Sequence, residues 1–251
     1  MTRAAIFLDR DGVINENRAD YVKTWEECRF LPGIFEPLRR LAQSPFAIVI
    51  TSNQSVINRG IVARSEVEEI NRRMIEEIQA NGGRIDAVFY CPHRPDENCD
   101  CRKPEPGLLL QAAECLNLDL RRSYLIGDAA SDIKAAVAAG CYPILVLTGR
   151  GKKQLPLLQD EGYSGYHVAS NLQEAVEWIL ARQGESQGRG IQMTRRNVGL
   201  ILIIAGIVAL LAAVTADLTG IGGQPGFGWK QMVGTSVGVI VAIIGGILCR
   251  S

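Results

Sequence analysis

The sequence predicts an α/β protein with a doubly wound, mostly parallel sheet, followed by a separate apolar segment at the C-terminus. Short apolar runs alternate along the chain with patterns that are typical of helices. These runs do not alternate between apolar and polar residues, which indicates strands that are buried on both faces. Charged residues become rare after residue 196, so the C-terminal part belongs to a different class of structure.

Strands are predicted at Ala4–Leu8, Ala47–Thr51, Ala87–Tyr90, Tyr124–Ile126 and Ile144–Leu147. Helices are predicted at Ile34–Ala42, Arg64–Ala80, Pro106–Leu116, Ser131–Ala139 and Leu172–Arg182. In the second of these helices the apolar residues recur at helical spacing, and the third begins with a proline. In sheets of this kind the active site lies at the carboxyl ends of the strands.

The composition narrows the classes of function. The chain has 251 residues, of which 47% are apolar, and this is enough for a packed core and excludes wholesale disorder. The 27 basic and 27 acidic residues give a formal net charge of zero. The chain is therefore no broad polycation, and we expect no nucleic acid among its partners.

The C-terminal segment predicts two membrane-spanning helices. Residues 197–216 and 231–249 contain no charged residue. A helix of about 20 residues, at about 1.5 Å per residue, crosses the roughly 30 Å hydrocarbon core of a bilayer. A pair of buried core helices is the alternative interpretation of the same pattern.

Arginines at positions 195, 196 and 250 flank the two apolar stretches. The positive-inside rule then predicts that both ends lie in the cytoplasm. We expect three parts, which are a globular domain at residues 1–182, a linker at 183–195 and a transmembrane helical hairpin at 196–251. The globular domain is expected to be cytoplasmic and anchored to a membrane through residues 197–249.

The strongest chemical signal is an Asp-Arg-Asp-Gly sequence directly after the first predicted strand. Asp9 and Asp11 are two positions apart there, and Gly12 allows a sharp turn, so that both carboxylates can face the cleft above the sheet. Like charges at this spacing call for a cation, and Mg²⁺ is the expected one. A solvated surface turn is the alternative.

Polar groups also gather near three later segments. Ser52, Asn53 and Gln54 follow the second strand and supply hydrogen-bond donors that suit phosphate oxygens, although a solvated loop fits them equally well. Two cations, Arg102 and Lys103, precede a helix, and a solvated charge pair would have the same pattern. Two carboxylates four positions apart follow the fourth strand, where a helix cap is a competing role; they are Asp128 and Asp132.

Together and in this order, the four motifs resemble the signature of the haloacid dehalogenase superfamily of phosphotransferases, over residues 3–182. The resemblance implies that Asp9 attacks phosphorus and forms an aspartyl-phosphate, while Asp11 protonates the leaving oxygen and then activates water. It implies a Mg²⁺ ion held by Asp9, the carbonyl group of Asp11, and Asp128. The remaining implied roles are hydrogen bonding to phosphate by Ser52, neutralisation of charge by Lys103, and orientation of the metal or of Lys103 by Asp132.

A second cluster predicts a structural zinc site. Cys91, His93, Cys99 and Cys101 supply four zinc ligands within eleven residues, which fits a closed tetrahedral site. The N-terminus has no apolar run long enough for a signal peptide, and in a reducing compartment clustered cysteines bind metal more often than they form disulfides. Redox-active or incidental cysteines are the alternative. The ligands end immediately before Arg102, so the zinc would fix the two cations there.

The zinc loop narrows the resemblance to the subfamily of D-glycero-D-manno-heptose 1,7-bisphosphate 7-phosphatases and histidinol-phosphatases. No long insertion interrupts the chain between the motifs, so no large cap domain is expected. The subfamily pattern implies substrate contacts by Asn17, Arg18, Ala19, Asp20, Ser52, Asn53, Gln54, Ser55, Arg102 and Lys103. Val56 departs from the glycine that is usual at its position, which leaves the conformation of that loop open.

The function implied is a Mg²⁺-dependent phosphatase that removes the 7-phosphate of the heptose bisphosphate through an aspartyl-phosphate. Histidinol phosphate or another small phosphosugar is the nearest alternative substrate. An inactive membrane scaffold is an alternative from another class, and the retained aspartates and Lys103 argue against it. A polynucleotide 3′-phosphatase is disfavoured because the chain lacks a basic stripe.

Overall fold

The computed structural model describes residues 2–188, 200–205, 207 and 208. The contacts between residues divide the chain into two units, Met1–Arg182 and Gln183–Ser251. The sheet, the cavities and the polar clusters described below all belong to the first unit.

A six-stranded sheet forms the centre of the first unit, and all of its strand pairs are parallel. Its order is β3-β2-β1-β4-β5-β6. The strands are β1 (Ala5–Leu8), β2 (Ala47–Asn53), β3 (Ala87–Cys91), β4 (Tyr124–Gly127), β5 (Tyr142–Val146) and β6 (His167–Ala169). The chain moves outward from β1 to β3, then returns to the other side of β1 for β4, so the order reverses between β1 and β4 at the middle of the sheet.

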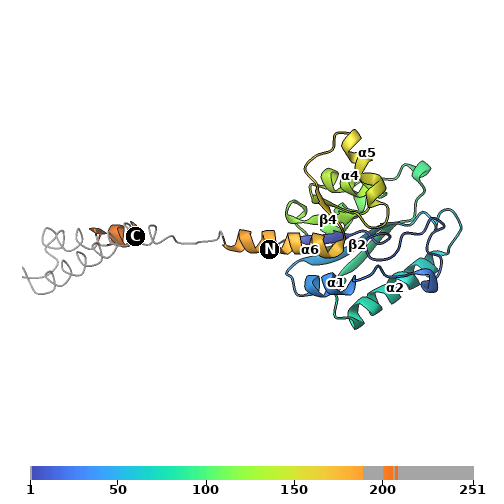
Figure 1. Ribbon diagram of the computed structural model, residues 1–251, viewed down its shortest axis with the longest axis horizontal. Helices are drawn as coiled ribbons and strands as arrows, with labels where there is room; N and C mark the ends of the chain where they lie inside the picture. The colour runs from blue at the N-terminus through green and yellow to red at the C-terminus, as the bar shows by residue number, and fades with distance from the viewer. Residues whose placement is uncertain (1, 189–199, 206, 209–251) are drawn as a thin grey trace, which may run out of the picture. The chain divides into compact units, whose positions relative to one another are not determined.

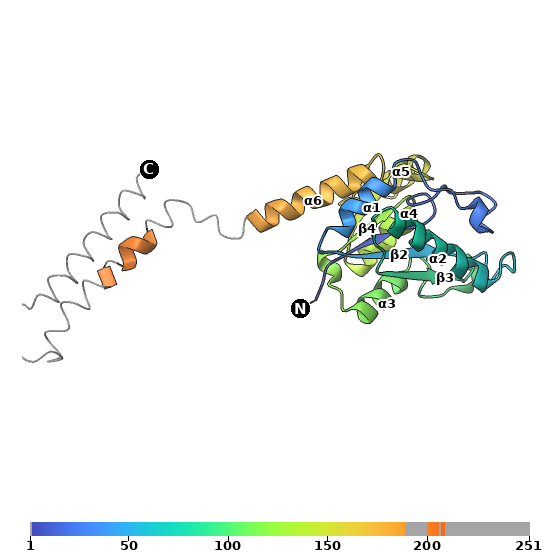
Figure 2. The same ribbon diagram turned by 90° about the horizontal axis from the view of Figure 1, so that it is seen from below.

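Helices cover both faces of the sheet, as expected for a doubly wound fold (Figures 1 and 2). They are α1 (Phe35–Ala42), α2 (Arg64–Ala80), α3 (Gly107–Leu116), α4 (Ala130–Ala139), α5 (Gly151–Asp160) and α6 (Leu172–Gly188). Side chains of β1 alternate between the two faces. Ile6 and Leu8 pack with buried residues of α1, α2 and α6, whereas Phe7 packs with buried residues of α3 and α4.

Every strand and helix predicted within residues 1–182 is present, and strand β6 and helix α5 are not in the prediction. Strand β6 has only three residues and pairs only with β5, so it is too short to give a pattern. Helix α5 contains Pro156 in its interior, and a proline there normally argues against a helix. Helix α6 continues to Gly188, six residues beyond the expected end at Arg182 and into the segment expected to be a linker.

The connections at the carboxyl edge of the sheet carry no inserted domain within the described residues. Between β1 and α1 the chain forms one short 3₁₀ turn, Trp25–Glu27, and between β2 and α2 it forms a loop. The expectation that no large cap is present therefore holds, and the carboxyl edge is open.

The predicted membrane anchor needs correction. No helix within residues 2–188, 200–205, 207 and 208 is both long enough and apolar enough to cross a bilayer. Most of the two predicted spans, 197–216 and 231–249, lie outside the described residues. The expected location, a domain held at a membrane by a C-terminal hairpin, is overturned by this finding.

Candidate active site

Asp9 follows the last residue of β1 and lies at the centre of the carboxyl edge, where it is 5% exposed. Its Oδ1 atom is 2.8 Å from the Nζ atom of Lys103. Burial raises the pKa of Asp9 to about 6, although the nearby ammonium group of Lys103 opposes this rise. The carboxylate is thus desolvated but still ionised for the most part at neutral pH, which suits a nucleophile.

Lys103 is the buried cation of this site and is 3% exposed. Besides Asp9, its Nζ atom contacts Asp132 Oδ1 at 2.6 Å and donates to the Thr51 carbonyl oxygen at 2.8 Å. Burial alone would lower the pKa of Lys103, but Asp132 and Asp9 together raise it above its usual value. Lys103 is therefore a fixed positive charge directly beside Asp9.

Asp11 is held by three side chains, two from its own segment and one from the loop after β2. Its carboxylate accepts hydrogen bonds from Arg10 at 3.1 Å, Asn15 at 2.9 Å and Gln54 at 2.9 Å. Burial works against ionisation, yet Arg10 and the hydrogen bonds of Asn15 and Gln54 hold the pKa of Asp11 below its usual value. Arg10 itself is 1% exposed and also donates to Asn71 Oδ1 of α2 at 3.2 Å.

Asp128 follows β4 and is fully buried. Its Oδ2 atom accepts from Asn17 Nδ2 at 3.3 Å and from the backbone N–H of Arg150 at 2.7 Å. Gly12, with φ of +97°, packs so closely that a Cβ atom there would lie 2.1 Å from Asp128 Oδ2. The first motif thus needs its glycine both for the left-handed turn and for the approach of this carboxylate.

Oxygen atoms of Asp9, Asp128 and Asp132 lie within 4.8 Å of one another and could hold a metal ion. This set shares two members with the ligands that the resemblance implies, Asp9 and Asp128. Asp132 is not among those implied ligands, and its carboxylate, like that of Asp9, is paired with Lys103, at 2.6 Å. Three buried carboxylates with hard oxygen donors match the preferences of Mg²⁺.

The side chains of the second motif, at the end of β2, hold other residues of the site in place. Gln54 donates to both Asp11 and Ser52, and Asn53 forms two hydrogen bonds with the backbone of Lys103, at 2.9 and 3.1 Å. Val56 is 1% exposed and packs with Val62 and Val67 in a small core of its own. The departure from glycine at this position therefore gives the loop an apolar anchor.

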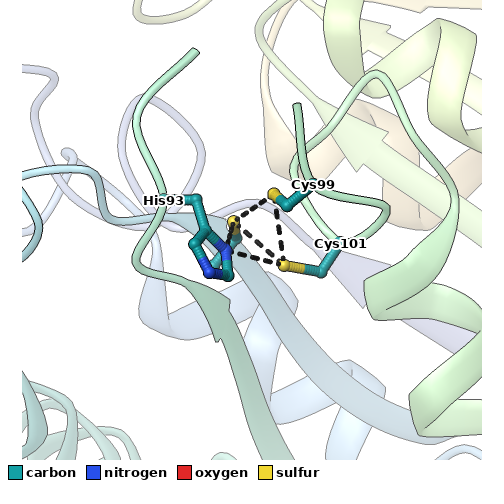
Figure 3. A group of neighbouring side chains, drawn as sticks. His93, Cys99 and Cys101 are labelled. Atoms are coloured by element: carbon teal, nitrogen blue, oxygen red, sulfur yellow. Dashed lines mark hydrogen bonds between the residues drawn. The ribbon is translucent and has the colours of Figure 1, made fainter. Parts of the chain in front are cut away.

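The expected zinc ligands lie together at the end of β3 and in the loop that follows it. His93, Cys99 and Cys101 point toward one another (Figure 3), and the ligand atoms of these residues and of Cys91 lie within 4.8 Å of one another. The Sγ–Sγ distances are 3.1 to 3.6 Å, close to the edge of about 3.8 Å that a tetrahedral Zn–S distance of 2.3 Å implies. No disulfide joins the described cysteines.

Two adjoining cavities open above these groups. The smaller has a volume of about 40 Å³ and is lined by Asp9, Asp11, Ser52, Asn53, Lys103, Ser131, Asp132 and Arg150. The larger has a volume of about 550 Å³ and includes the predicted substrate residues Asn17, Arg18, Ala19, Asn53, Gln54, Ser55, Arg102 and Lys103. Asp20 is not among its lining residues. It forms ion pairs with Arg18 and Lys23 instead.

Sequence reasoning missed several residues that line the cavities, among them Arg10, Arg59, Ser131 and Arg150. Arg10 lies inside the first motif, and the rule that sites lie at the carboxyl ends of strands applies equally to Arg150, which follows β5. Both signals were therefore present in the sequence. The contacts of Arg10 with Asp11 and Asn71, in contrast, require the folded chain.

A family model described as HAD-hydrolase-like matches residues 100–175. The D-glycero-beta-D-manno-heptose-1,7-bisphosphate 7-phosphatase of Pseudomonas aeruginosa is 41% identical over 162 residues, which cover 64% of this chain and 91% of that protein. The enzyme of the same name from Bordetella bronchiseptica is 38% identical over 175 residues, which cover 70% of this chain and 97% of that protein. The chain belongs to the heptose bisphosphate phosphatase family of haloacid dehalogenase-like hydrolases.

A solved member of this family has the same fold. The D,D-heptose 1,7-bisphosphate phosphatase of B. bronchiseptica, in a crystal structure complexed with magnesium and phosphate, superposes with a TM-score of 0.68 at 37% identity. The match covers 71% of this chain and 99% of that chain. A second such structure, from Burkholderia thailandensis, has a TM-score of 0.56 at 30% identity. The resemblance predicted from the four motifs is confirmed, and the chain is a phosphatase of the heptose bisphosphate phosphatase family.

Proposed function

We propose that this protein removes the 7-phosphate of D-glycero-D-manno-heptose 1,7-bisphosphate, through a phosphorylated Asp9. The proposal is supported by the names of relatives that are 37 to 41% identical and by the arrangement of the buried charges around Asp9. We assign the catalytic unit to residues 1–182.

The positive charge of the larger cavity is the observation that favours a bisphosphate as the substrate. It is lined by five arginines and one lysine, which are Arg10, Arg18, Arg59, Arg102, Arg150 and Lys103. Among the described residues that line it, Asp11 supplies the one carboxylate, and that carboxylate is paired with Arg10 at 2.9 Å. Such a cavity favours a substrate with two phosphates over histidinol phosphate, whose amine would face these cations without a carboxylate partner.

In this mechanism Asp9 attacks the phosphorus atom in line with the leaving oxygen, and a phosphoryl–aspartate bond forms as the bond to the sugar oxygen breaks. Lys103 stabilises the charge that develops on the transferred group, because its Nζ atom is 2.8 Å from the attacking carboxylate. Ser52 lines the same small cavity and donates its hydroxyl hydrogen to a phosphate oxygen.

Asp11 provides the proton for the leaving oxygen and later removes a proton from the attacking water. Its lowered pKa makes it a carboxylate while the site holds no phosphate. The negative charge of a bound phosphate raises the pKa of this neighbouring carboxyl group, which favours the protonated form that the first step needs.

The residues present fit both metals that the family resemblance implies. Asp9 and Asp128, with the carbonyl group of Asp11, would hold Mg²⁺, which supplies neutralisation of phosphoryl charge when it is bound. The three thiolates and one imidazole of the Cys91 cluster would hold Zn²⁺ in a closed site, with a structural role.

A substrate panel tests the proposal. We expect kcat/KM for the heptose 1,7-bisphosphate to exceed that for histidinol phosphate and for monophosphates of hexoses by at least 100-fold, in the presence of Mg²⁺. Both anomers of the bisphosphate belong in the panel, because the relatives are named for the beta form. A higher kcat/KM for histidinol phosphate would reject the proposed substrate.

A further inference from the structure

Arg150 is placed at the mouth of the site by a rigid turn. The turn Thr148–Arg150 follows β5, and Thr148 Oγ1 donates to the Gly12 carbonyl oxygen at 2.6 Å. Gly149, with φ of +52°, packs against Asp128, because a Cβ atom there would lie 2.2 Å from Asp128 Oδ2. The backbone N–H of Arg150 donates to the same oxygen at 2.7 Å. The Cα atom of Arg150 is therefore fixed beside the first motif.

The guanidinium group of Arg150 is held much less firmly than its backbone. Its described polar contact is with Asp128 Oδ1 at 3.4 Å, a long hydrogen bond, and its side chain is 54% exposed. Arg150 lines both the smaller cavity around Asp9 and the larger cavity. A long side chain with one weak partner can therefore move between these two cavities.

The other cations near Asp9 are already engaged. Lys103 is bound to Asp9 and Asp132, and Arg10 is bound to Asp11 and Asn71. Farther out, Arg18 pairs with Asp20 at 3.0 Å.

Arg102 donates to the His93 carbonyl oxygen at 3.1 Å and is tied to the zinc loop. Arg59 lines the larger cavity but not the smaller one. Two cations line both cavities, Lys103 and Arg150. Lys103 is held in close ion pairs, whereas Arg150 can bind a substrate without breaking one.

A divalent cation at Asp128 would repel the guanidinium group, because both carry positive charge and compete for the same carboxylate. The side chain would then turn toward the larger cavity, where the carboxylate of Asp11 is already paired with Arg10. An anionic group of the substrate is the partner that remains. Arginine binds phosphate through two parallel hydrogen bonds, so this contact also has directional specificity.

We propose that Arg150 is a specificity-determining residue of this site, whose guanidinium group leaves Asp128 when a divalent cation occupies that carboxylate and binds the substrate phosphate that is not transferred. This inference rests on the proposed function, since it requires a substrate with two phosphates.

The test compares heptose 1,7-bisphosphate with the matching heptose 7-phosphate, which lacks the second phosphate. In Arg150→Gln, the ratio of kcat/KM for the two substrates falls by about 10- to 100-fold, mainly through KM for the bisphosphate, as expected for the loss of a charge-assisted contact. Arg150→Lys, which keeps the charge but not the two parallel bonds, falls between this variant and the wild type. Arg121→Gln, at an exposed position before β4, keeps the wild-type ratio.

Binding measurements add a readout that does not depend on turnover. In an Asp9→Asn background with Mg²⁺, calorimetry is expected to give a Kd for the bisphosphate that is about 10- to 100-fold weaker when Arg150 is also replaced by glutamine. The Mg²⁺ affinity of Arg150→Gln alone should equal or exceed that of the wild type, because a competitor for Asp128 has been removed. A weaker Mg²⁺ affinity would overturn the proposal, since Arg150 would then support the metal site.

An equal loss of kcat/KM for both substrates, or an unchanged ratio, would also overturn it. A wild-type protein with no preference for the bisphosphate would instead reject the proposed function. The two failures are therefore distinguishable.

Discussion

At the carboxyl edge of the sheet, the burial of charged side chains determines which partners they contact and how their pKa values shift. Asp9, Lys103, Asp128 and Asp132 are each 5% exposed or less. A buried charge without a partner is strongly unfavourable, and each of these groups accordingly contacts an opposite charge. The same burial that destabilises the site raises the pKa of Asp9 to about 6 and removes its hydration shell, and such a carboxylate would suit the proposed attack on phosphorus.

Asp11→Asn is expected to lower kcat by at least about 100-fold, because an amide can neither give nor take the proton. The same change leaves Arg10, which is 1% exposed, without its charged partner, so Tm should also fall. Steady-state kinetics and thermal unfolding measure the two effects, and binding of inorganic phosphate should largely survive. Asp160→Asn, at the exposed end of α5, is the matched control. Full turnover in Asp11→Asn would refute the assigned role.

Cys141 gives a pH dependence that is independent of the active site. It is 5% exposed, and burial raises the pKa of its thiol from 9.0 to about 12. The unfolded chain therefore loses this proton at a lower pH than the folded protein, so the stabilising contribution is complete below pH 9 and declines as pH rises toward 12. The free energy of unfolding falls by about 1 kcal/mol between pH 9 and 10 through this thiol.

Cys141→Ala should therefore show a smaller fall in the free energy of unfolding between pH 8 and pH 10 than the wild type. Urea unfolding at both pH values measures this difference. Cys115→Ala, at an exposed position, should retain the wild-type pH dependence. An identical pH dependence in Cys141→Ala and the wild type would contradict the assigned effect of burial.

At this scale the sequence predicts which carboxylates lie at the carboxyl edge better than it predicts the groups that hold them. Asp9, Asp11 and Asp128 stand at strand ends, where carboxylates are recognisable as chemical groups. Asn53 lines both cavities, as a substrate contact would, and its side chain also bonds to the backbone of Lys103, 50 positions later, which the sequence does not predict. Only the pairing of β2 with β3 and the path of the zinc loop bring these two residues together.

Among the structural elements, the loop of residues 91–101, which carries the predicted zinc ligands and is called the zinc loop here, contacts the cations that follow it, because Arg102 donates to the His93 carbonyl oxygen. Two residues of the loop between β2 and α2 bond to the zinc loop. Gln54 donates its backbone N–H to the Cys91 carbonyl oxygen at 2.7 Å, and the Asn58 side chain donates to Glu97 at 3.0 Å. The zinc loop thus supports both the second motif and the segment with Arg102 and Lys103. A metal there would stabilise two sides of the substrate cavity at once.

Removal of zinc with a chelator is expected to lower Tm by several degrees and to raise KM more than it lowers kcat, because the loops that line the cavity lose their support. Elemental analysis should find one zinc per chain before treatment, and Cys99→Ser should reproduce the effect of the chelator. A zinc-free protein with unchanged Tm and KM would contradict this account of the loop.

Helices and strands of this chain are predictable from the sequence where the pattern of apolar residues is long. Helix α2 has 17 residues and begins and ends as predicted, because its apolar stripe is complete. Strand β6 and helix α5 were missed, since one is three residues long and the other contains Pro156. Contacts with β5 and α4 stabilise these elements, and such contacts are invisible to a local pattern.

For the whole molecule, strand order is the feature that makes the site. The reversal of the order between β1 and β4 brings the first and fourth motifs together, although they are more than 100 positions apart. Buried apolar runs predict a parallel sheet but not the order of its strands. The order β3-β2-β1-β4-β5-β6 is therefore known only from the structure.

A chain that ends at residue 190 should retain wild-type kcat/KM and Tm. The last buried core residue described is Ile179, and the residues that line the two cavities extend no further than Arg150. Steady-state kinetics and thermal unfolding of the shortened chain measure this directly. Loss of folding would show that the catalytic unit extends beyond the proposed residues 1–182.

The most direct test is to identify the residue that becomes phosphorylated. Rapid acid quench during turnover of the bisphosphate, followed by borohydride reduction and peptide mass spectrometry, would mark the acyl-phosphate. We expect the mark on Asp9 alone, formed at a rate no slower than kcat, and absent in Asp9→Asn. A mark on another side chain, or turnover at full rate in Asp9→Asn, would contradict the account.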